Sequence, residues 1–520
     1  MPSLNPAHWD QEQLTTLMKN TPTGTQKTAH TSHEAIATHH PLSTWAGLQA
    51  LQLGGSAADA IVTMLALDTV LQPGISTLAG SLSLIYHESV SGQTYALNAG
   101  FNRPLNDDMT YDPQLHQTTG RAVLVPGIVA GLEMLWHRFG ILPWADLWRP
   151  AIYFAREGFI LNDAYFHTIQ RRQKVLLRSA EGCAIFAPTG ELPTRESLFQ
   201  QPQLTETLKK VALRGTTYFY RGDWARQFVN TIQRHGGNMR LEDMQLYQPR
   251  WDTPLVGHYL NYELRTVPPP HYGGAALCYE LAIAEALGLH QLSSRAVSAQ
   301  TLHEEMQICK LAMQTSELKQ DLHNATKAEQ AAFRHVLSQA QVSRRATSIL
   351  NHDIQLESTS DNDGQAHHLA AIDRAGNFIS AIHSLEGPPW GETGLFVEGV
   401  ALNSGANRIY DRLPAPGARI SEPMTTYLVL QNGKPYFAAA ASGVGQQLCA
   451  LQHTMNLLTH TMSLSQTVSQ PRQGYPLQNN EEMRERTDYC YWTAVGLDTQ
   501  TGRPTAVIDL RLAENASSDS

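Results

Sequence analysis

A hairpin pattern stands out in the distribution of hydrophobic and polar residues along the chain. Leu369–Ile372 is a short apolar run, Asp373–Asn377 is a polar segment that ends in Gly-Asn, and apolar residues return at Phe378. Two apolar runs joined by a short Gly- and Asn-containing turn are typical of a β-hairpin. We therefore predict two paired, buried strands on either side of Asp373–Asn377.

The N-terminal part of the chain has a helical pattern followed by another hairpin pattern. Pro41–Leu71 contains two apolar segments around a Gly-Gly-Ser turn, which predicts two helices with Ser56 as the cap of the second. Ala57–Val70 is almost wholly apolar, so this second helix is expected to be buried on all sides. Ser81–His87 and Gln93–Asn98 lie on either side of Ser91-Gly92, and this pattern predicts two paired strands.

These motifs, taken in order, resemble the γ-glutamyltranspeptidase family of N-terminal-nucleophile hydrolases. The second subunit of that family begins with Thr-Thr-His, a short strand, Asp, two residues and Gly-Asn, and His368, Asp373 and Gly376-Asn377 match this pattern. The predicted helical pair resembles the opening of the family's first subunit, and the resemblance extends from about residue 35 to residue 510. It implies an α+β fold, a four-layer αββα sandwich with two stacked antiparallel sheets between helical layers.

The resemblance places Ala366 where the family has its catalytic threonine. The threonine hydroxyl first cuts the chain at the preceding carbonyl and then acts as the nucleophile, with its freed α-amine as the base. A methyl group can do neither, so this chain, whether the alanine is natural or introduced, is expected to stay uncleaved and inactive by that route. We expect a polar leader over 1–34, a large-subunit-like region over 35–365 and a small-subunit-like region over 366–520, within one continuous fold.

Two further catalytic positions follow from the resemblance. Ala440–Gln446 lies between a predicted strand, Tyr436–Ala440, and the predicted helix Leu448–Leu458, where free backbone N–H groups collect at a helix N-terminus. Gly443 and Gly445 are therefore candidates for an oxyanion hole, although a simple helix-entry turn has the same pattern. Ser384 stands at a threonine position of the family's hairpin and is a candidate hydrogen-bond partner of the nucleophile.

The substrate-binding positions depart from the family almost throughout. Gly100 stands where the family has the arginine that holds the glutamyl α-carboxylate, and the groups that hold the α-amine are also replaced. A γ-glutamyl substrate is therefore not expected, and the resemblance leaves a biosynthetic amide or carbon–carbon bond hydrolase. The candidates for a new polar lining, each equally compatible with a structural or surface role, are Arg103, His367, Glu386, Arg408 and Glu422.

Composition limits the remaining alternatives. A formal charge of −9 provides no basic surface for nucleic acid, and no window is apolar enough to span a membrane. The 22 histidines, among them His39-His40 and His271, lack metal-ligand spacing, so neither a metal nor another cofactor is predicted. The N-terminus lacks a signal-peptide pattern, which favours a cytoplasmic protein. We expect a small-molecule substrate, and two subunits if the precursor is processed. A homodimer is compatible with the sequence. The alternative to the enzyme is a pseudoenzyme that binds a ligand or partner.

Overall fold

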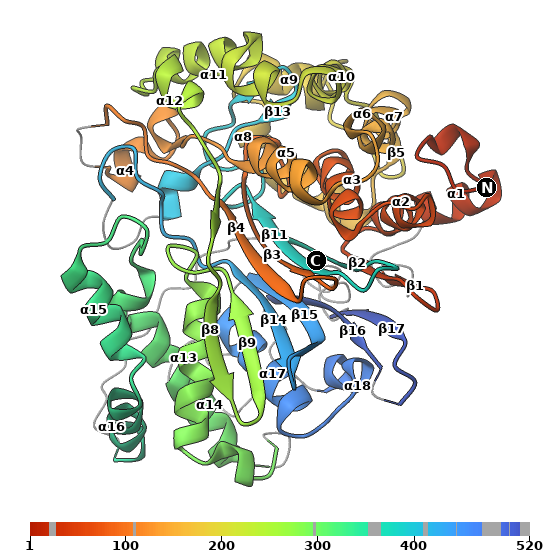
Figure 1. Ribbon diagram of the computed structural model, residues 1–520. Coiled ribbons are helices and arrows are strands. Elements are labelled where there is room, and N and C mark those ends of the chain that lie inside the picture. The colour runs from red at the N-terminus through yellow and green to blue at the C-terminus, as the bar shows by residue number, and fades with distance from the viewer. Residues whose placement is uncertain are drawn as a thin grey trace.

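Two antiparallel sheets lie face to face between two helical layers in the computed structural model (Figure 1). The predicted α+β fold with four αββα layers is therefore confirmed. Within the described residues there is no helix both long and apolar enough to cross a membrane. The structure describes residues 1–19, 28–107, 111–294, 298–351, 366–408, 414–443, 445–470, 490–498 and 500–509.

The first sheet has the strand order β1-β2-β10-β11-β3-β4-β7, so the predicted hairpin lies at its centre. β10 and β11, which follow residue 366, lie between β2 and β3, which precede it, so neither region could form this sheet alone. The division of the chain at residue 366 stays a prediction. The strands are β1 (Thr28–His30), β2 (Ala35–Thr38), β3 (Ser81–Glu88), β4 (Gln93–Ala99), β7 (Arg250–Asp252), β10 (His367–Ile372) and β11 (Phe378–Ser384).

The second sheet has the order β17-β16-β15-β14-β9-β8 and packs on the first through its central strands. Apolar side chains of both sheets, such as Ile372, Phe378 and Leu428, form a buried layer between them. The strands are β8 (Leu255–Tyr259), β9 (Tyr262–Thr266), β14 (Thr425–Gln431), β15 (Lys434–Gly443), β16 (Cys490–Leu497) and β17 (Pro504–Ile508).

Helices cover the outer face of each sheet (Figure 1). On the first sheet α2 (Pro41–Gln52), α3 (Ala57–Leu71) and α5 (Ile128–Phe139) pack against the strands, and α7 (Arg149–Glu157), α10 (Pro202–Thr216) and α11 (Asp223–Arg234) lie outside them. On the second they include α13 (Gly273–Ala286), α14 (Ala299–Gln314), α16 (Gln339–Leu350) and α17 (Gln446–Leu458). As predicted, α3 is buried along its whole length, and Ser56 caps it in a reciprocal pair with Asp59.

The turn between β10 and β11 is held by one carboxylate. Asp373 accepts hydrogen bonds from the backbone N–H groups of Ala375 and Asn377, both at 3.0 Å, and from the Asn377 amide at 2.8 Å. It also accepts from the N–H of Ala57 at 2.9 Å, at the N-terminus of α3. This contact ties the hairpin to a helix more than 300 positions earlier, so Asp373 fixes both the turn and its packing on α3.

Candidate active site

Ala366 lies directly before β10, at the end of the central hairpin. Its side chain packs with Ile382 and Met424, and the residue is only 8% exposed. Its carbonyl oxygen accepts a hydrogen bond from the Ser442 hydroxyl at 3.1 Å. The predicted nucleophile position is thus enclosed, and it contacts the segment that contains the predicted oxyanion-hole glycines.

That segment forms the junction between β15 and α17. β15 ends at Gly443 and α17 begins at Gln446, with Gly445 as its N-cap. Gly443 has φ of +92° and Gly445 has φ of +76°, left-handed conformations that glycine adopts without steric cost. Val444 lies outside the described residues. The first N–H groups of α17 have no acceptor within the helix, and Ser442, four residues before the helix, contacts Ala366. The role of Gly443 and Gly445 as oxyanion donors stays a prediction.

Four imidazoles gather around the start of β10. The ring centroid of His367 lies 4.7 Å from that of His39 and 5.6 Å from that of His383, and the ring of His368 lies 5.2 Å from that of His39. Burial lowers the pKa of both His368 and His383 to about 3, so both rings are neutral at physiological pH. Among the described residues, no group of three or more His, Cys, Asp or Glu side chains is arranged to hold a metal ion.

We predict that His368 makes the chain sensitive to acid. The residue is fully buried and neither ring nitrogen has a hydrogen-bond partner among the described residues. Its pKa of about 3 in the folded state lies below the value of about 6.5 expected when unfolded, so acidification protonates the unfolded chain first. Its contribution to stability is therefore complete above pH ~6.5 and falls by about 1.4 kcal/mol per pH unit as the pH drops toward 3.

Urea denaturation at pH 7.5 and pH 5.0 tests this. In His368→Leu, the loss of unfolding free energy between the two pH values should be smaller than in the unmodified chain by about 2 kcal/mol. His258→Leu, at an exposed position in β8, is the matched control. An equal loss in His368→Leu and in the unmodified chain would show that this ring does not stay neutral in the fold.

A second buried polar cluster surrounds Glu422. The carboxylate accepts a hydrogen bond from the Ser81 hydroxyl at 2.6 Å and one from the Phe101 N–H at 3.3 Å, and it lies 3.2 Å from Nε2 of His271. Burial raises the pKa of Glu422, while burial and the charge of Arg419 lower that of His271. The two groups therefore form a hydrogen-bonded pair near neutral pH rather than an ion pair.

Gly100 lies against this cluster. A Cβ at this position would lie 2.4 Å from Nε2 of His271 and 2.5 Å from a carboxylate oxygen of Glu422. Arg419 contributes the nearest guanidinium, but it donates to the carbonyl oxygens of Gly100 and Gln248 and to the hydroxyl of Tyr247. The structure thus leaves no room at position 100 for an arginine, or for any other side chain, without rearrangement.

The remaining candidates lie in different surroundings. Ser384 is buried at the end of β11, and its hydroxyl accepts from the N–H of Glu386 at 2.8 Å. Glu386 follows with φ of +53°, an uncommon conformation for a residue with a side chain. The Arg103 guanidinium is bound to Asp107 at 2.8 Å and to the carbonyl oxygen of Pro414 at 2.6 Å. Arg408 ends the 3₁₀ helix that starts at Gly405, and its side chain lies outside the described residues.

Sequence reasoning assigned no role to Ser81, His271, His383 or Arg419. These residues come from segments that are distant in sequence. Ser81 and His383 lie on the paired strands β3 and β11, whereas His271 and Arg419 lie in segments that β-bridges join to Glu422 and Asn102. The sequence contains one signal that points to this cluster. Gly100 and Glu422 both replace family residues of a different size or charge.

Comparison with known proteins identifies the family. Residues 43–489 match the family described as Gamma-glutamyltranspeptidase. The chain is 27% identical over 475 residues to the glutathione hydrolase proenzyme of Bacillus subtilis, an alignment that covers 84% of this chain and 80% of that protein. It is also 27% identical over 476 residues to the acylase ACY 1 proenzyme of a Pseudomonas species, covering 86% and 83% respectively.

A solved structure with a similar fold is also that of an acylase. The crystal structure of cephalosporin acylase from Bacillus halodurans superposes with a TM-score of 0.76 at 20% identity, and covers 95% of this chain and 97% of that one. Proenzymes of a glutathione hydrolase and of an acylase are thus relatives of this chain in sequence, and the cephalosporin acylase has a similar fold. The chain belongs to the gamma-glutamyltranspeptidase family of N-terminal-nucleophile hydrolases.

Proposed function

We propose that this chain has the site of a γ-glutamyltranspeptidase-type hydrolase or acyltransferase in which Ala366 occupies the nucleophile position. The observation that carries the proposal is the hydrogen bond between the Ala366 carbonyl and Ser442, which joins the start of β10 to the Gly443–Gly445 junction. A hydroxyl at position 366 would have backbone donors nearby for a developing oxyanion. With a methyl group there, the chain neither cuts itself nor forms an acyl-enzyme at this residue.

The acyl group that fits this site does not carry the γ-glutamyl zwitterion. Its carboxylate would have to approach Gly100, beside the buried carboxyl group of Glu422 and with the nearest guanidinium already bonded inside the protein. Two acids brought together in a water-poor site raise the free energy of the charged forms. An acyl chain with a single acid and no neighbouring amine is the substrate class we favour, with Arg408 as the proposed partner of that acid.

A non-catalytic binding protein is the second candidate, and the Ala366 side chain itself favours it. The methyl group packs with Ile382 and Met424 in a small apolar cluster. In this alternative, the enclosed hairpin end keeps the shape of the family's site and serves to bind a ligand without transforming it.

Restoring the hydroxyl separates the two candidates. Ala366→Thr is made together with Ala366→Val, which has nearly the same shape but no oxygen. Chain cleavage followed by amide hydrolysis in the threonine variant alone supports the hydrolase-type site. A folded threonine variant that neither cuts itself nor hydrolyses an amide supports the binding protein.

A further inference from the structure

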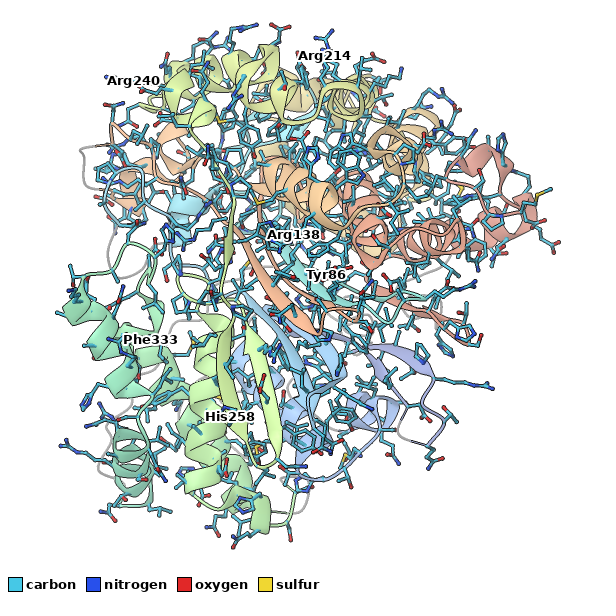
Figure 2. All side chains as sticks on the ribbon, viewed as in Figure 1. Tyr86, Arg138, Arg214, Arg240, His258 and Phe333 are labelled. Atoms are coloured by element: carbon cyan, nitrogen blue, oxygen red, sulfur yellow. The ribbon has the colours of Figure 1, made fainter. Side chains whose placement is uncertain are left out.

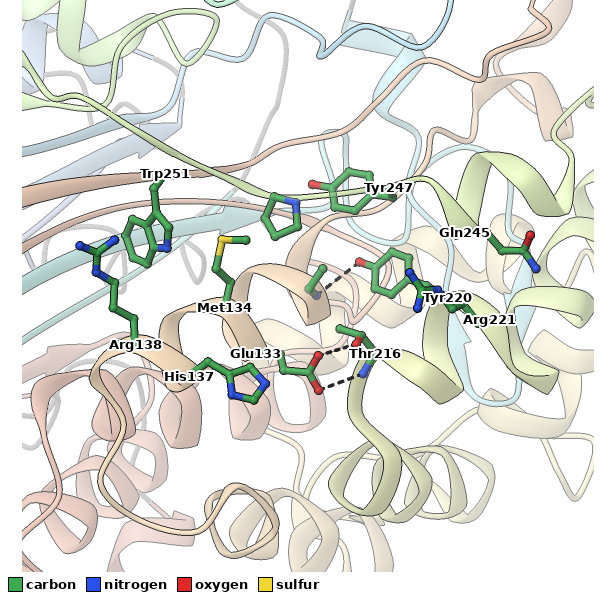
Figure 3. Close-up of a pocket in the computed structure, with 12 residues that line it drawn as sticks. Glu133, Met134, His137, Arg138, Thr216, Tyr220, Arg221, Gln245, Tyr247 and Trp251 are labelled. Carbon is green, nitrogen blue, oxygen red and sulfur yellow. Dashed lines mark hydrogen bonds between the residues drawn. The ribbon is translucent and has the colours of Figure 1, made fainter.

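A separate pocket lies on the outer side of the first sheet, between the C-terminal half of α5 and the edge strand β7 (Figure 3). The helical turn Thr217–Arg221 and the end of α12 (Leu241–Gln245) close its other sides. Its volume is about 610 Å³, within the range of small-molecule sites. Its described lining includes none of the residues predicted for the active site.

The pocket combines an apolar interior with a cationic rim. Met134, Tyr247 and Pro249 line the interior, whereas Arg138 and Arg221 stand at opposite ends (Figure 3). Both arginines are exposed, and neither has a carboxylate within ion-pair distance among the described residues. Two unneutralised guanidinium groups in a protein of net charge −9 mark a local preference for anions.

Arg138 is fixed by aromatic rings rather than by an acid. Its guanidinium carbon lies 4.0 Å from the ring centroid of Tyr95 and 5.2 Å from that of Trp251. Contact with the ring faces restricts the side chain while leaving the N–H donors at the edge of the guanidinium plane unused. A donor fork held in this way is preorganised to bind a carboxylate with two parallel hydrogen bonds.

The acid that lines the pocket has a structural role. Glu133 accepts hydrogen bonds from the N–H of Thr216, at 3.2 Å, and from its hydroxyl. Gly215 makes this possible, because its φ is +52° and a Cβ there would lie 1.8 Å from a Glu133 carboxylate oxygen. Glu133 therefore fixes the junction between α10 and the following turn, and its charge is not paired with either arginine.

We propose that this pocket binds a small organic anion with a flat apolar body. Its carboxylate would bind the Arg138 guanidinium beside Trp251, and its body would lie along Met134 and Pro249 toward Tyr247. The apolar body supplies the burial, and the guanidinium selects the acid over a neutral analogue of the same shape. The described lining of this pocket does not include residue 366, and its link to the Glu422 cluster is through Tyr247, which also bonds Arg419 and the carbonyl oxygen of Gly100.

Calorimetric titration of the full chain with 2-naphthoate tests the proposal, with neutral 2-naphthamide as the matched ligand. We expect saturable 1:1 binding of the acid, and binding of the amide that is at least about tenfold weaker, because a hydrogen bond to a charged group is lost. Arg138→Gln should weaken binding of the acid at least about tenfold, and Arg138→Lys should weaken it less. Arg214→Gln is the control, since this exposed arginine of α10 lies well apart from Arg138 (Figure 2).

A second variant tests whether the Arg138 substitutions act on binding only indirectly. Met134→Trp fills the middle of the pocket without removing a charge, and it should abolish binding of the acid. The absence of saturable binding to the unmodified chain, equal affinity for acid and amide, or unchanged affinity in either Arg138→Gln or Met134→Trp would each overturn the proposal.

Discussion

Ala366→Thr is expected to convert a single chain into two fragments, cut between Gln365 and residue 366. Three features around residue 366 favour the reaction: β10 begins at the next residue, Asp373 holds the hairpin turn, and Ser442 contacts the carbonyl of residue 366. A threonine hydroxyl would then attack the preceding carbonyl, transfer the acyl group from nitrogen to oxygen, and release a new N-terminus on hydrolysis. A denaturing gel over time, with N-terminal sequencing of the smaller fragment, measures the conversion.

The Ala366→Val variant is the control for this result. Valine introduces the branched shape of threonine next to Ile382 and Met424 but no oxygen, so it should remain uncut. Cleavage of the valine variant would show that a protease rather than residue 366 cuts the chain. A folded threonine variant that stays intact would mean that the surrounding donors no longer support the reaction.

Once cleaved, the Ala366→Thr protein should prefer glutaryl-p-nitroanilide to γ-glutamyl-p-nitroanilide by roughly 30-fold or more in kcat/KM. The two substrates differ by one ammonium group, and a buried charge left without a partner costs about 2–5 kcal/mol. Two of the positions matched to the family's amine-binding groups cannot pair with an ammonium, because Gly405 has no side chain and Arg408 has the same charge. Release of p-nitroaniline measures both reactions in the same assay.

Two variants sharpen this comparison. Arg408→Ala should raise KM for the glutaryl substrate, whereas Arg103→Ala should change KM less, because the Arg103 guanidinium is bound to Asp107 and Pro414 in the structure. Faster turnover of the γ-glutamyl substrate would contradict the proposed substrate class. It would mean that the site contains a partner for the ammonium group. It would also mean that the match of Gly405 to the family's amine-binding position is out of register.

Local patterns predicted the elements that carry the site. The apolar runs around Asp373–Asn377 and the Gly-rich segment after the strand at Tyr436–Ala440 each correspond to an observed junction. The strand that the pattern ended at Ala440 continues to Gly443, and the helix begins two residues earlier than expected, at Gln446. Element boundaries depend on caps and hydrogen bonds that a hydrophobic pattern does not contain.

The polar interior could not be predicted in the same way. Glu422 was expected as a lining residue, but its partners Ser81 and His271 lie 341 and 151 positions away in the chain. Burial pulls the pKa values of such groups in opposite directions, and burial is a property of the packed sheets rather than of a local segment. For the same reason, the pocket beside Arg138 has no sequence signature, since α5, the Thr217–Arg221 turn and β7 meet only in the fold.

Intact mass spectrometry of the unmodified chain, after purification and prolonged incubation, tests most directly the claim that Ala366 occupies the nucleophile position. Because a methyl group lacks the oxygen for the acyl shift, we expect one polypeptide near 57.5 kDa at every time point. Two fragments, the smaller one beginning at Ala366, would contradict the account.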